Sequence, residues 1–458
     1  MRRWNAHQIS HAAGAQLLRV DSRGVGGPDR ATIDSRDAVR GSLFVGLPGE
    51  QVDGGMFAPG AIVAGAWGVL VAPAHADVLL AGAGSDPGTP PTAGAVLVAD
   101  DPLAALQRLA TVWRRELGAQ VIGVTGSTGK TSTKDLLFGV LSPYRMTVAS
   151  QANFNTEIGL PLQILSAPAG TEVLVLEMGM RGPGQIAELA RIAEPDVGVI
   201  VSIGPVHLEL LGSIEAVAAA KSELIASLAP GSTAVIPAGE RLLEPHLRAD
   251  LNNVTFGPGG DVHIAAETAT QVEIDAQGQS VSFHVDFTAA HLRQDLLAAV
   301  AASRAIGVQP GGRLELTLSP GRGQLKHLPG SITLIDDAYN ANPVSMRAAL
   351  DALAGTDAHG RRIAVLGDML ELGPDAERYH EQIGAHADGI ADLLLTVGPL
   401  ASAMARVFHG QYHHAPDAAA AAAALPGLLR AGDVVLVKAS NGVGLKLVCE
   451  TLATTAPA

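Results

Sequence analysis

Val121-Ile-Gly-Val-Thr-Gly-Ser-Thr-Gly-Lys-Thr-Ser-Thr-Lys134 is the stretch that decides the fold of the chain around it. Its first residues form a short apolar run, which predicts a buried parallel strand. Gly126 and Gly129 then predict a tight turn, and the apolar residues at 135–141 predict a helix. A Gly-rich turn between strand and helix presents backbone N–H groups to an anion, and Lys130 adds a positive charge. The stretch therefore predicts a phosphate-binding loop.

The motif has the short form Gly-x-x-Gly-Lys-Thr, because Val124 stands where the strict eight-residue motif has glycine. Thr131 supplies a hydroxyl suited to Mg²⁺. The alternative is an ordinary Gly-rich turn with a chance lysine, and the strand–turn–helix context argues against it.

Composition excludes several classes of protein. The 458 residues carry 31 Lys+Arg against 45 Asp+Glu, a net charge of −14, so the basic footprint needed to bind nucleic acid or an anionic membrane is missing. Cys449 is the only cysteine, which predicts a reducing compartment and hence the cytoplasm. The N-terminus lacks the apolar core of a signal peptide, and no run is long enough to predict a membrane span.

The order of predicted elements indicates an α/β protein of three domains. Residues 1–100 read as a small α/β domain, residues 101–312 as a central domain around the phosphate loop, and residues 313–458 as a second strand–helix alternation. Residues 82–94 are rich in Gly, Pro, Ser and Thr, which predicts a mobile loop. Alternating residues near Val272 and Val281 predict antiparallel strands late in the central domain.

Polar residues follow successive predicted strands of the central domain. Glu177 ends the apolar run Val173–Glu177, His207 follows the next run, and Lys221 lies in a helix that begins after Ser213. Taken singly, each is more often a surface or packing residue. Because the carboxyl ends of parallel strands meet at one edge of a sheet, the three side chains can converge near the phosphate loop.

Further polar loops follow predicted strands elsewhere. Ser35 and Arg36 could hold a diphosphate or sugar, or form only a turn and a surface ion pair. Asn153 and Asn155 could donate to a substrate, or serve ordinary turn chemistry. In the last domain, polar loops follow three strands and suggest a binding face, although each alone could be a plain turn: Asp336 and Asp337 with residues 339–343, residues 367–373, and residues 438–441.

These motifs, in this order and over nearly the whole length, resemble the Mur ligases, ATP-dependent amide-forming enzymes of peptidoglycan precursor synthesis. The segments Asn153-Phe-Asn155, Glu177-Met-Gly179, Asp336-Asp-Ala-Tyr-Asn-Ala-Asn-Pro343 and Gly367-Asp-Met-Leu-Glu-Leu-Gly373 resemble the branch that joins D-alanyl-D-alanine to UDP-N-acetylmuramoyl-tripeptide through an acyl phosphate. The resemblance implies a UDP-substrate domain, a central P-loop-type, mostly parallel sheet and a Rossmann-like C-terminal domain. It also implies a cytoplasmic acid–amino-acid ligase, expected to be a monomer.

The resemblance also implies roles for particular residues. Catalysis is expected from Lys130, Glu177, His207 and Lys221, and Mg²⁺ binding from Thr131, Glu177, His207 and a carbamylated Lys221. ATP binding is expected from Gly126, Ser127, Thr128, Gly129, Lys130, Thr131, Ser132, His291, Asp295, Arg322 and Asp337. Substrate binding is expected from Ser35, Arg36, Asn153, Asn155, Tyr339, Asn340 and Asn342.

Two positions depart from the family pattern. Asp295 stands where the adenine-binding segment usually has a second Asn, and an aspartate can accept from the adenine amino group but cannot donate. Asn441 stands where an arginine is common, and loss of the arginine is expected to weaken a contact to substrate or phosphate.

Rival functions remain open at this point. One is another amide ligase, namely the diaminopimelate- or lysine-adding Mur enzyme or a folylpolyglutamate synthase; the Asn-rich loop after Asp337 argues against these. Another is a nucleotide switch or motor, although the guanine-reading Asn-Lys-x-Asp stretch is missing. The third residue of the tripeptide is not specified by the sequence.

Overall fold

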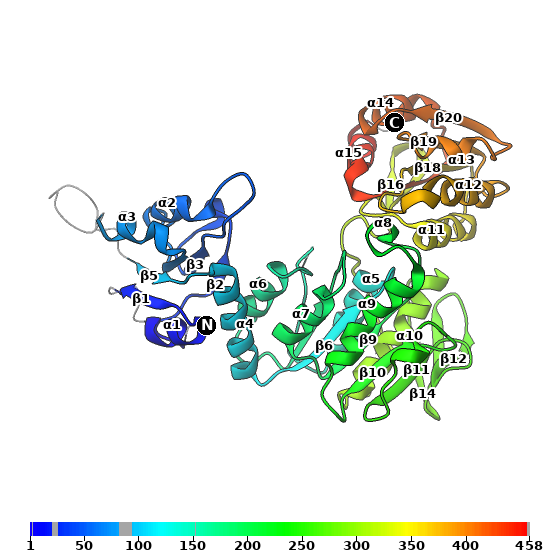
Figure 1. Cartoon of the computed structure of the whole chain (residues 1–458). Coiled ribbons are helices and arrows are strands. Elements are labelled where there is room, and N and C mark those ends of the chain that lie inside the picture. Colours follow the sequence, from blue (N-terminus) through cyan, green and yellow to red (C-terminus); the bar gives the residue numbers. More distant parts are fainter. Residues whose placement is uncertain (2, 21–25, 82–93, 152, 456–458) are drawn as a thin grey trace.

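The computed structural model describes residues 1, 3–20, 26–81, 94–151 and 153–455, and it contains three β-sheets in chain order (Figure 1). The loop predicted at residues 82–94 lies, except for Gly94, outside the described residues. The predicted α/β architecture, with a mostly parallel central sheet and a Rossmann-like last sheet, is confirmed.

The first sheet has five strands in the order β1-β5-β4-β3-β2, with only β1 antiparallel to its neighbour. Its inner strands are short, fully buried apolar runs, as expected where helices cover a parallel sheet. The elements are α1 (Ala6–Ala13), β1 (Gln16–Arg19), β2 (Arg30–Thr32), β3 (Ser42–Val45), α2 (Ala58–Val63), β4 (Gly68–Val71), α3 (Ala76–Ala81) and β5 (Ala95–Val98).

Helix α4 (Pro102–Leu117) joins the first sheet to the second. Asp101 caps it by accepting from the N–H of Ala104 at 3.0 Å, and Pro102 occupies its first turn, as the sequence predicts. Trp113 of this helix meets Trp4 edge-to-face, with ring centroids 5.1 Å apart. One continuous apolar core therefore runs from the first sheet through α4 into the helices of the second.

The second sheet has ten strands in the order β15-β14-β13-β12-β11-β10-β9-β6-β8-β7. The phosphate-loop strand β6 lies between β8 and β9, and all pairs from β7 to β12 are parallel. The antiparallel strands predicted near Val272 and Val281 are β13 and β14. The strands are β6 (Gln120–Thr125), β7 (Thr147–Ala149), β8 (Val173–Glu177), β9 (Val197–Ile200), β10 (Thr233–Pro237), β11 (Asn252–Phe256), β12 (Val262–Glu267), β13 (Gln271–Ala276), β14 (Gln279–His284) and β15 (Gly312–Arg313).

Helices cover both faces of the second sheet's parallel part. Alternation along β6 sends Ile122 and Val124 to one face, where they share a core with α5 (Lys130–Leu141) and α10 (Ala290–Ala305). The opposite face packs on α6 (Gly159–Ser166), α7 (Gln185–Ala193) and α9 (Ile214–Ser227). The short helix α8 (Leu208–Leu211) precedes α9.

The third sheet has six strands in the order β16-β17-β21-β18-β19-β20, all parallel except the edge strand β16. The alanine-rich helix α14 buries Ala421 and Leu425 against the sheet. The elements are β16 (Gln324–Leu328), β17 (Ile332–Asp336), α11 (Pro343–Gly355), β18 (Arg362–Gly367), α12 (Ala376–Ala387), β19 (Leu393–Val397), α13 (Ser402–Ala405), β20 (Gln411–Ala415), α14 (Ala418–Leu428), β21 (Val434–Lys438) and α15 (Lys446–Thr455).

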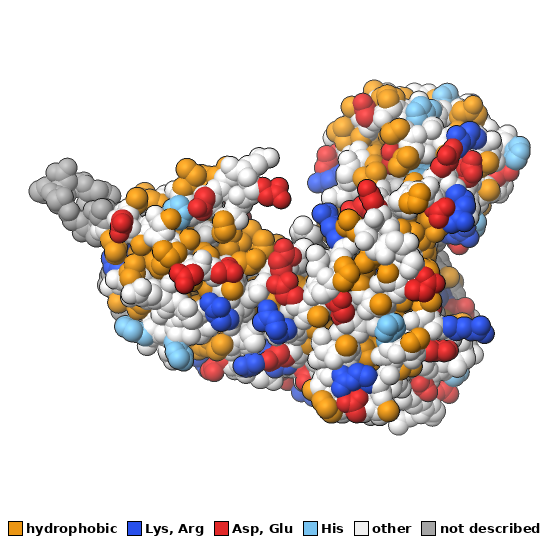
Figure 2. All heavy atoms as spheres, viewed as in Figure 1, with side chains coloured by type: hydrophobic (Ala, Val, Ile, Leu, Met, Phe, Trp, Pro, Cys, Tyr) orange, Lys and Arg blue, Asp and Glu red, His pale blue; other side chains and the backbone are white. Residues whose placement is uncertain are grey.

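The part of the molecule that carries the third sheet lies at the end of the second part where α5 and α8 are. The part that carries the first sheet lies beside the second part, next to α4 and α6 (Figure 1). The space-filling view shows an open notch between the first and third parts of the molecule (Figure 2). Among the described residues, no helix combines the length and apolar character needed to cross a bilayer.

Candidate active site

The phosphate loop, residues 126–132, connects β6 to α5 as predicted. Gly126 and Gly129 have φ of 157° and 79°, and Gly129 occupies the left-handed conformation that favours glycine. Ser202, after the neighbouring strand β9, holds the loop by accepting from the N–H of Ser127 at its carbonyl and from the N–H of Thr128 at its hydroxyl, both at 2.9 Å. Lys130 Nζ donates to the Gly126 carbonyl at 2.8 Å, so the ammonium folds over the loop.

Glu177 ends the adjacent strand β8 and reaches the same loop. The Thr131 hydroxyl donates to Glu177 Oε2 at 2.9 Å, and Asn155 Nδ2 donates to Oε1 at 2.8 Å. The Ser150 hydroxyl accepts from the N–H of Glu177 at 3.0 Å. The structure thus brings together Thr131, Glu177 and Asn155, three residues that the sequence places far apart.

Lys221 is a buried amine without a counterion. Its side chain is 2% exposed, and no hydrogen bond or ion pair reaches it from the described residues. Burial, and then the nearby positive charge of Lys130, hold the pKa of Lys221 well below its usual range. A neutral amine is therefore favoured at this position.

His207 follows β9, and its ring meets a residue that the sequence did not single out as a site residue. Its Nδ1 is hydrogen-bonded to the carboxylate of Glu371, which belongs to the loop after β18 of the third sheet. Desolvation lowers the pKa of His207, opposed by Glu371 and assisted by Lys221 and Lys130. His207 is therefore near both lysines, and a neutral ring is favoured.

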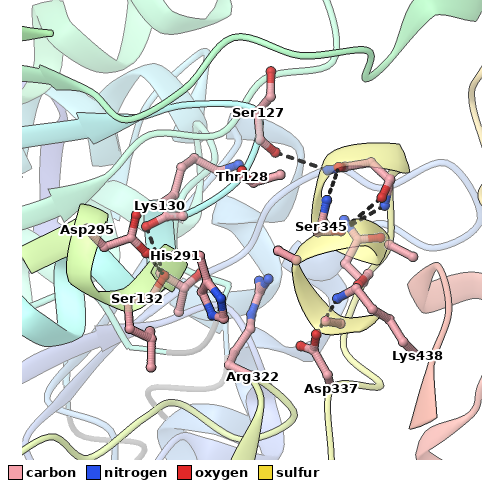
Figure 3. A pocket seen from close by; sticks show the side chains of 18 residues that line it. Ser127, Thr128, Lys130, Ser132, His291, Asp295, Arg322, Asp337, Ser345 and Lys438 are labelled. Atoms are coloured by element: carbon pink, nitrogen blue, oxygen red, sulfur yellow. Dashed lines mark hydrogen bonds and ion pairs between the residues drawn. The ribbon is translucent and has the colours of Figure 1, made fainter. Parts of the chain in front are cut away.

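A polar pocket separates the phosphate loop from the third sheet (Figure 3). The loop side chains lie on one side, Asp337, Ser345 and Lys438 lie on the other, and His291 and Arg322 lie between them. The pocket is lined by Ser127, Thr128, Gly129, Lys130, Thr131, Ser132, His291, Leu292, Asp295, Arg322, Asp337, Asn340, Ala341, Asn342, Ser345, Ala348, Ala349 and Lys438. It gathers every residue expected to bind nucleotide except Gly126.

The third sheet's side of the pocket is built from loops at the carboxyl ends of β17 and β21. Lys438 Nζ donates to Asp337 Oδ2 at 2.6 Å and to the Asn340 carbonyl at 3.0 Å. Burial lowers the pKa of Lys438, partly offset by Asp337. The Arg322 guanidinium lies 4.1 Å from the centre of the Tyr339 ring, a cation–π contact. A carboxylate and two fixed cations therefore face the phosphate loop.

Asn342 links the two walls. Its Oδ1 caps α11 by accepting from the N–H of Ser345 at 3.0 Å, while its Nδ2 donates to the Ser127 carbonyl at 3.3 Å. A second close approach lies beside it. Gly204, after β9, packs against Val344 of α11, and a Cβ on Gly204 would lie 2.9 Å from Val344 Cγ2. The cap of a third-sheet helix thus touches the phosphate loop itself.

Asp295, expected near adenine, lies behind the phosphate loop. It is 4% exposed and accepts a hydrogen bond from the Ser132 hydroxyl. A Cβ on Gly129 would lie 2.6 Å from Asp295 Oδ1, so the carboxyl packs directly against the loop. Burial, opposed by the hydrogen bond from Ser132, raises the pKa of Asp295 to about 7.

Other predicted residues lie outside the pocket. Arg36 forms an ion pair with Asp34 and its side chain is 87% exposed, beside Ser35 in the same turn. Asn153 is exposed. Asp336 is buried beneath the pocket wall, where it accepts from Lys326 Nζ at 2.6 Å and from Cys449 Sγ at 3.3 Å.

Among the polar residues described at the pocket and its junction, three were absent from the predicted site: Ser345, Glu371 and Lys438. All lie within or beside loops that the sequence marked as polar and at the carboxyl end of a strand. The sequence thus predicted which loops face the site. It did not predict which side chain of each loop points into the site, because that depends on local backbone geometry.

Comparison with known proteins agrees with this architecture. Residues 124–303 match the family model described as the Mur ligase middle domain, and residues 321–441 match that of the Mur ligase, glutamate ligase domain. The chain is 37% identical over 436 residues to the UDP-N-acetylmuramoyl-tripeptide--D-alanyl-D-alanine ligase of Synechocystis sp., covering 93% of this chain and 92% of that protein.

Two solved structures are similar over nearly the whole chain. MurF from Acinetobacter baumannii has a TM-score of 0.83 at 26% identity, covering 99% of both chains. MurF ligase from Thermotoga maritima in complex with ADP has a TM-score of 0.76 at 28% identity, covering 93% of this chain and 97% of that chain. The resemblance carried by the motifs is confirmed, and the chain belongs to the Mur ligase family.

Proposed function

We propose that this Mur ligase joins D-alanyl-D-alanine to the terminal carboxylate of UDP-N-acetylmuramoyl-tripeptide, with ATP converted to ADP and phosphate. Relatives that carry this activity in their name match the chain over nearly its whole length. One observation carries the proposal: a phosphate loop and the polar loops of a second α/β sheet face each other across one pocket. Such a pocket can hold a nucleotide at one wall and a reacting partner at the other.

The pocket residues fit ATP. Backbone N–H groups of residues 126–132, the start of α5 and Lys130 suit a triphosphate, and Arg322 adds a cation. Asp337 could accept from ribose hydroxyls, and His291 lies at the pocket edge. Asp295 also lines the pocket, and its carboxyl already accepts a hydrogen bond from Ser132. A related MurF structure holds ADP.

The residues near the loop also fit Mg²⁺, which would neutralise the charge of the triphosphate and carboxylate. The Thr131 hydroxyl and Glu177 carboxylate already lie 2.9 Å apart, and both are oxygen ligands of the type Mg²⁺ prefers. No cluster of three His, Cys, Asp or Glu side chains that could hold a metal occurs in the described part of the chain. The remaining ligands would thus come from phosphates, water, His207 and a modified Lys221.

Carbamylation of Lys221 is proposed on its environment. Only an unprotonated amine attacks CO₂, and burial favours that form here. The product is an anion, so a buried amine without a partner would become a group able to bind Mg²⁺ or orient its water ligands. The anion would also attract Lys130, whose positive charge disfavours an ammonium at Lys221.

The reaction would proceed in two balanced steps. The tripeptide carboxylate attacks the γ-phosphorus of ATP, forming an acyl phosphate and releasing ADP. The amine of D-alanyl-D-alanine then attacks the acyl carbon, the C–O bond to phosphate breaks, and the amine loses a proton. Lys130 and Arg322 offset the charge that gathers in the first step, which depends mainly on positioning and electrostatics.

Substrates would enter from the open notch between the first and third parts of the molecule (Figure 2). Ser35 and Arg36 would contact the UDP-linked substrate, and Asn153 and Asn155 its peptide. Tyr339, Asn340 and Asn342 would face the incoming dipeptide. In this proposal residues 1–100, 101–312 and 313–458 act as substrate, ATP and ligase domains of a cytoplasmic monomer.

One assay tests the proposal. Purified protein is incubated with ATP, Mg²⁺, D-alanyl-D-alanine and UDP-linked tripeptides ending in either diaminopimelate or lysine, and products are identified by mass spectrometry. We expect one tripeptide to gain the dipeptide with matching phosphate release. ATP consumption without a joined product would contradict the proposal, and ligation of a single amino acid instead would assign the chain to another Mur reaction.

A further inference from the structure

The contact between His207 and Glu371 joins two sheets at the edge of the candidate active site. The ring Nδ1 is hydrogen-bonded to Glu371 Oε2, and Arg181 Nε lies 3.9 Å from Glu371 Oε1. The backbone is engaged too, because the N–H of Glu209 donates to the Glu371 carbonyl at 3.3 Å. Helix α8, which begins directly after His207, lies at the junction with the third sheet (Figure 1).

Both residues have unusual backbone conformations. His207 and Glu371 have φ of 53° and 62°, in the left-handed region that non-glycine residues rarely adopt. Such conformations are unfavourable for non-glycine residues, and they cluster at functional sites. The two residues that form the contact between the second and third sheets therefore both have an unfavourable backbone conformation.

The loop that carries Glu371 is held firmly from within its own sheet. His380, which is fully buried, accepts from the N–H of Met369 at 2.9 Å through Nε2 and donates to the Ala376 carbonyl at 2.6 Å through Nδ1. The N–H of Leu370 donates to the Ser440 hydroxyl at 2.9 Å. The carboxylate of Glu371 is therefore presented from a fixed support.

A carboxylate can only accept, so the His207 Nδ1 must carry the proton of this hydrogen bond. The other ring nitrogen, Nε2, then has a free lone pair, and no hydrogen bond within the described residues occupies it. A carboxylate that fixes one ring nitrogen commonly orients a histidine whose other nitrogen binds a metal.

We propose that Glu371 is a positioning residue, which holds His207 as its Nδ1–H tautomer so that Nε2 binds a divalent cation only while the third sheet is docked on the second. The inference rests on the proposed function, because it assumes a cation at the phosphate loop. Beyond that function, it states that Glu371 of the third sheet orients His207 of the second sheet for binding the cation.

The tautomer can be measured without nucleotide or metal. In ¹⁵N-histidine NMR spectra, with His207 assigned through the His207→Asn variant, we expect Nδ1 protonated and Nε2 unprotonated in the full-length protein. Glu371→Ala should shift His207 toward the Nε2–H form. A doubly protonated ring, an Nε2–H ring in the unaltered protein, or an unchanged tautomer in the variant would overturn the inference.

The consequence for the cation is measured by Mn²⁺ titration followed by electron paramagnetic resonance, with a non-hydrolysable ATP analogue. Glu371→Ala should weaken Mn²⁺ binding about tenfold or more. Glu377→Ala is the matched control, because it removes a third-sheet glutamate whose partner is Arg406; it should leave binding unchanged. Glu371→Ala should add nothing in the His207→Asn background. Additive losses, or equal losses in the control, would overturn the inference.

The two hypotheses fail in different ways. If the ligation assay fails but the tautomer and Mn²⁺ results hold, Glu371 still positions a cation ligand in an enzyme of another reaction. If ligation succeeds while Glu371→Ala changes neither measurement, the proposed function stands and this inference falls.

Discussion

The carboxyl group of Asp295 accepts a hydrogen bond from the Ser132 hydroxyl and packs against Gly129, directly behind the phosphate loop. Burial raises its pKa from 3.8 to about 7, so this group changes charge near neutral pH. An ionisable side chain therefore lies against the loop that is expected to hold the triphosphate.

Asp295→Asn is expected to stabilise the protein at and above pH 7. Because the folded-state pKa is raised, the folded protein binds more protons than the unfolded chain between about pH 4 and 7, and its stability falls as pH rises through that window. The variant keeps a hydrogen-bond acceptor for Ser132 but removes the charge. We expect a gain of roughly 1–4 kcal/mol in the free energy of unfolding at pH 8, and little at pH 4, from urea titrations.

Asp261→Asn provides a control of opposite sign. Asp261 accepts from the N–H and hydroxyl of Thr255 at 2.8 and 2.7 Å, which lowers its pKa. Its contribution to stability is present above the unfolded pKa and is lost as pH falls, so removing the charge should reduce stability at neutral pH. A gain at pH 8 in this variant as well would show that general charge reduction, and not Asp295, is responsible.

Nucleotide binding is expected to take up a proton at Asp295. A bound triphosphate adds negative charge beside the loop, which disfavours ionised Asp295 further. At pH 7.5, calorimetric titrations with an ATP analogue in buffers of different ionisation enthalpy should show greater proton uptake in the unaltered protein than in Asp295→Asn. Equal uptake would mean that the carboxyl does not sense the nucleotide.

Much of the fold follows from local sequence. Buried parallel strands are short apolar runs, so β6 and β8 are predicted nearly to the residue. Strands β10 and β11 were not assigned, because β11 carries polar, partly exposed residues at its start. Its place in the sheet is set by pairing with β10, a long-range property.

Site residues divide in the same way. The phosphate loop and Glu177 are predictable because each lies at the end of a strand of one sheet. Glu371 and Lys438 act across distances that no spacing encodes, and the packing of Asp295 against Gly129 of the loop is likewise set by tertiary structure.

Lys130→Ala is expected to abolish ligation while leaving the fold intact. The ammonium contacts only the Gly126 carbonyl among hydrogen-bond partners in the described chain, so little packing depends on it. Loss of this charge at the phosphates should lower the rate by at least about a hundredfold. Phosphate release measures the rate, and circular dichroism of the same preparations measures the fold. If the variant has lost its helical spectrum, misfolding explains the loss of rate and the prediction is contradicted.

Lys221→Ala is expected to be inactive and partly restored by short carboxylic acids, which can replace a carbamate in the space vacated by the side chain. The structure supports the carbamate because the amine is buried and lacks a counterion. Activity is compared with and without acetate or propionate, with chloride at equal ionic strength as the control. In parallel, ¹³CO₂ labelling of the unaltered protein should give a carbamate signal by NMR, and its absence would argue against the modification.

The Asn342 side chain has two functions that different substitutions can separate. Its Oδ1 caps α11 and its Nδ2 donates to the Ser127 carbonyl of the phosphate loop. Asn342→Ser keeps a good helix cap but is too short to reach Ser127, whereas Asn342→Ala loses both interactions. The Ala variant should be less stable than the Ser variant by about 1 kcal/mol, measured by urea unfolding. Both should raise the KM for ATP equally, because the link between the third sheet and the loop is lost in each. If the KM instead follows stability, with Ser close to the unaltered protein, then the cap and not the contact with Ser127 supports nucleotide binding.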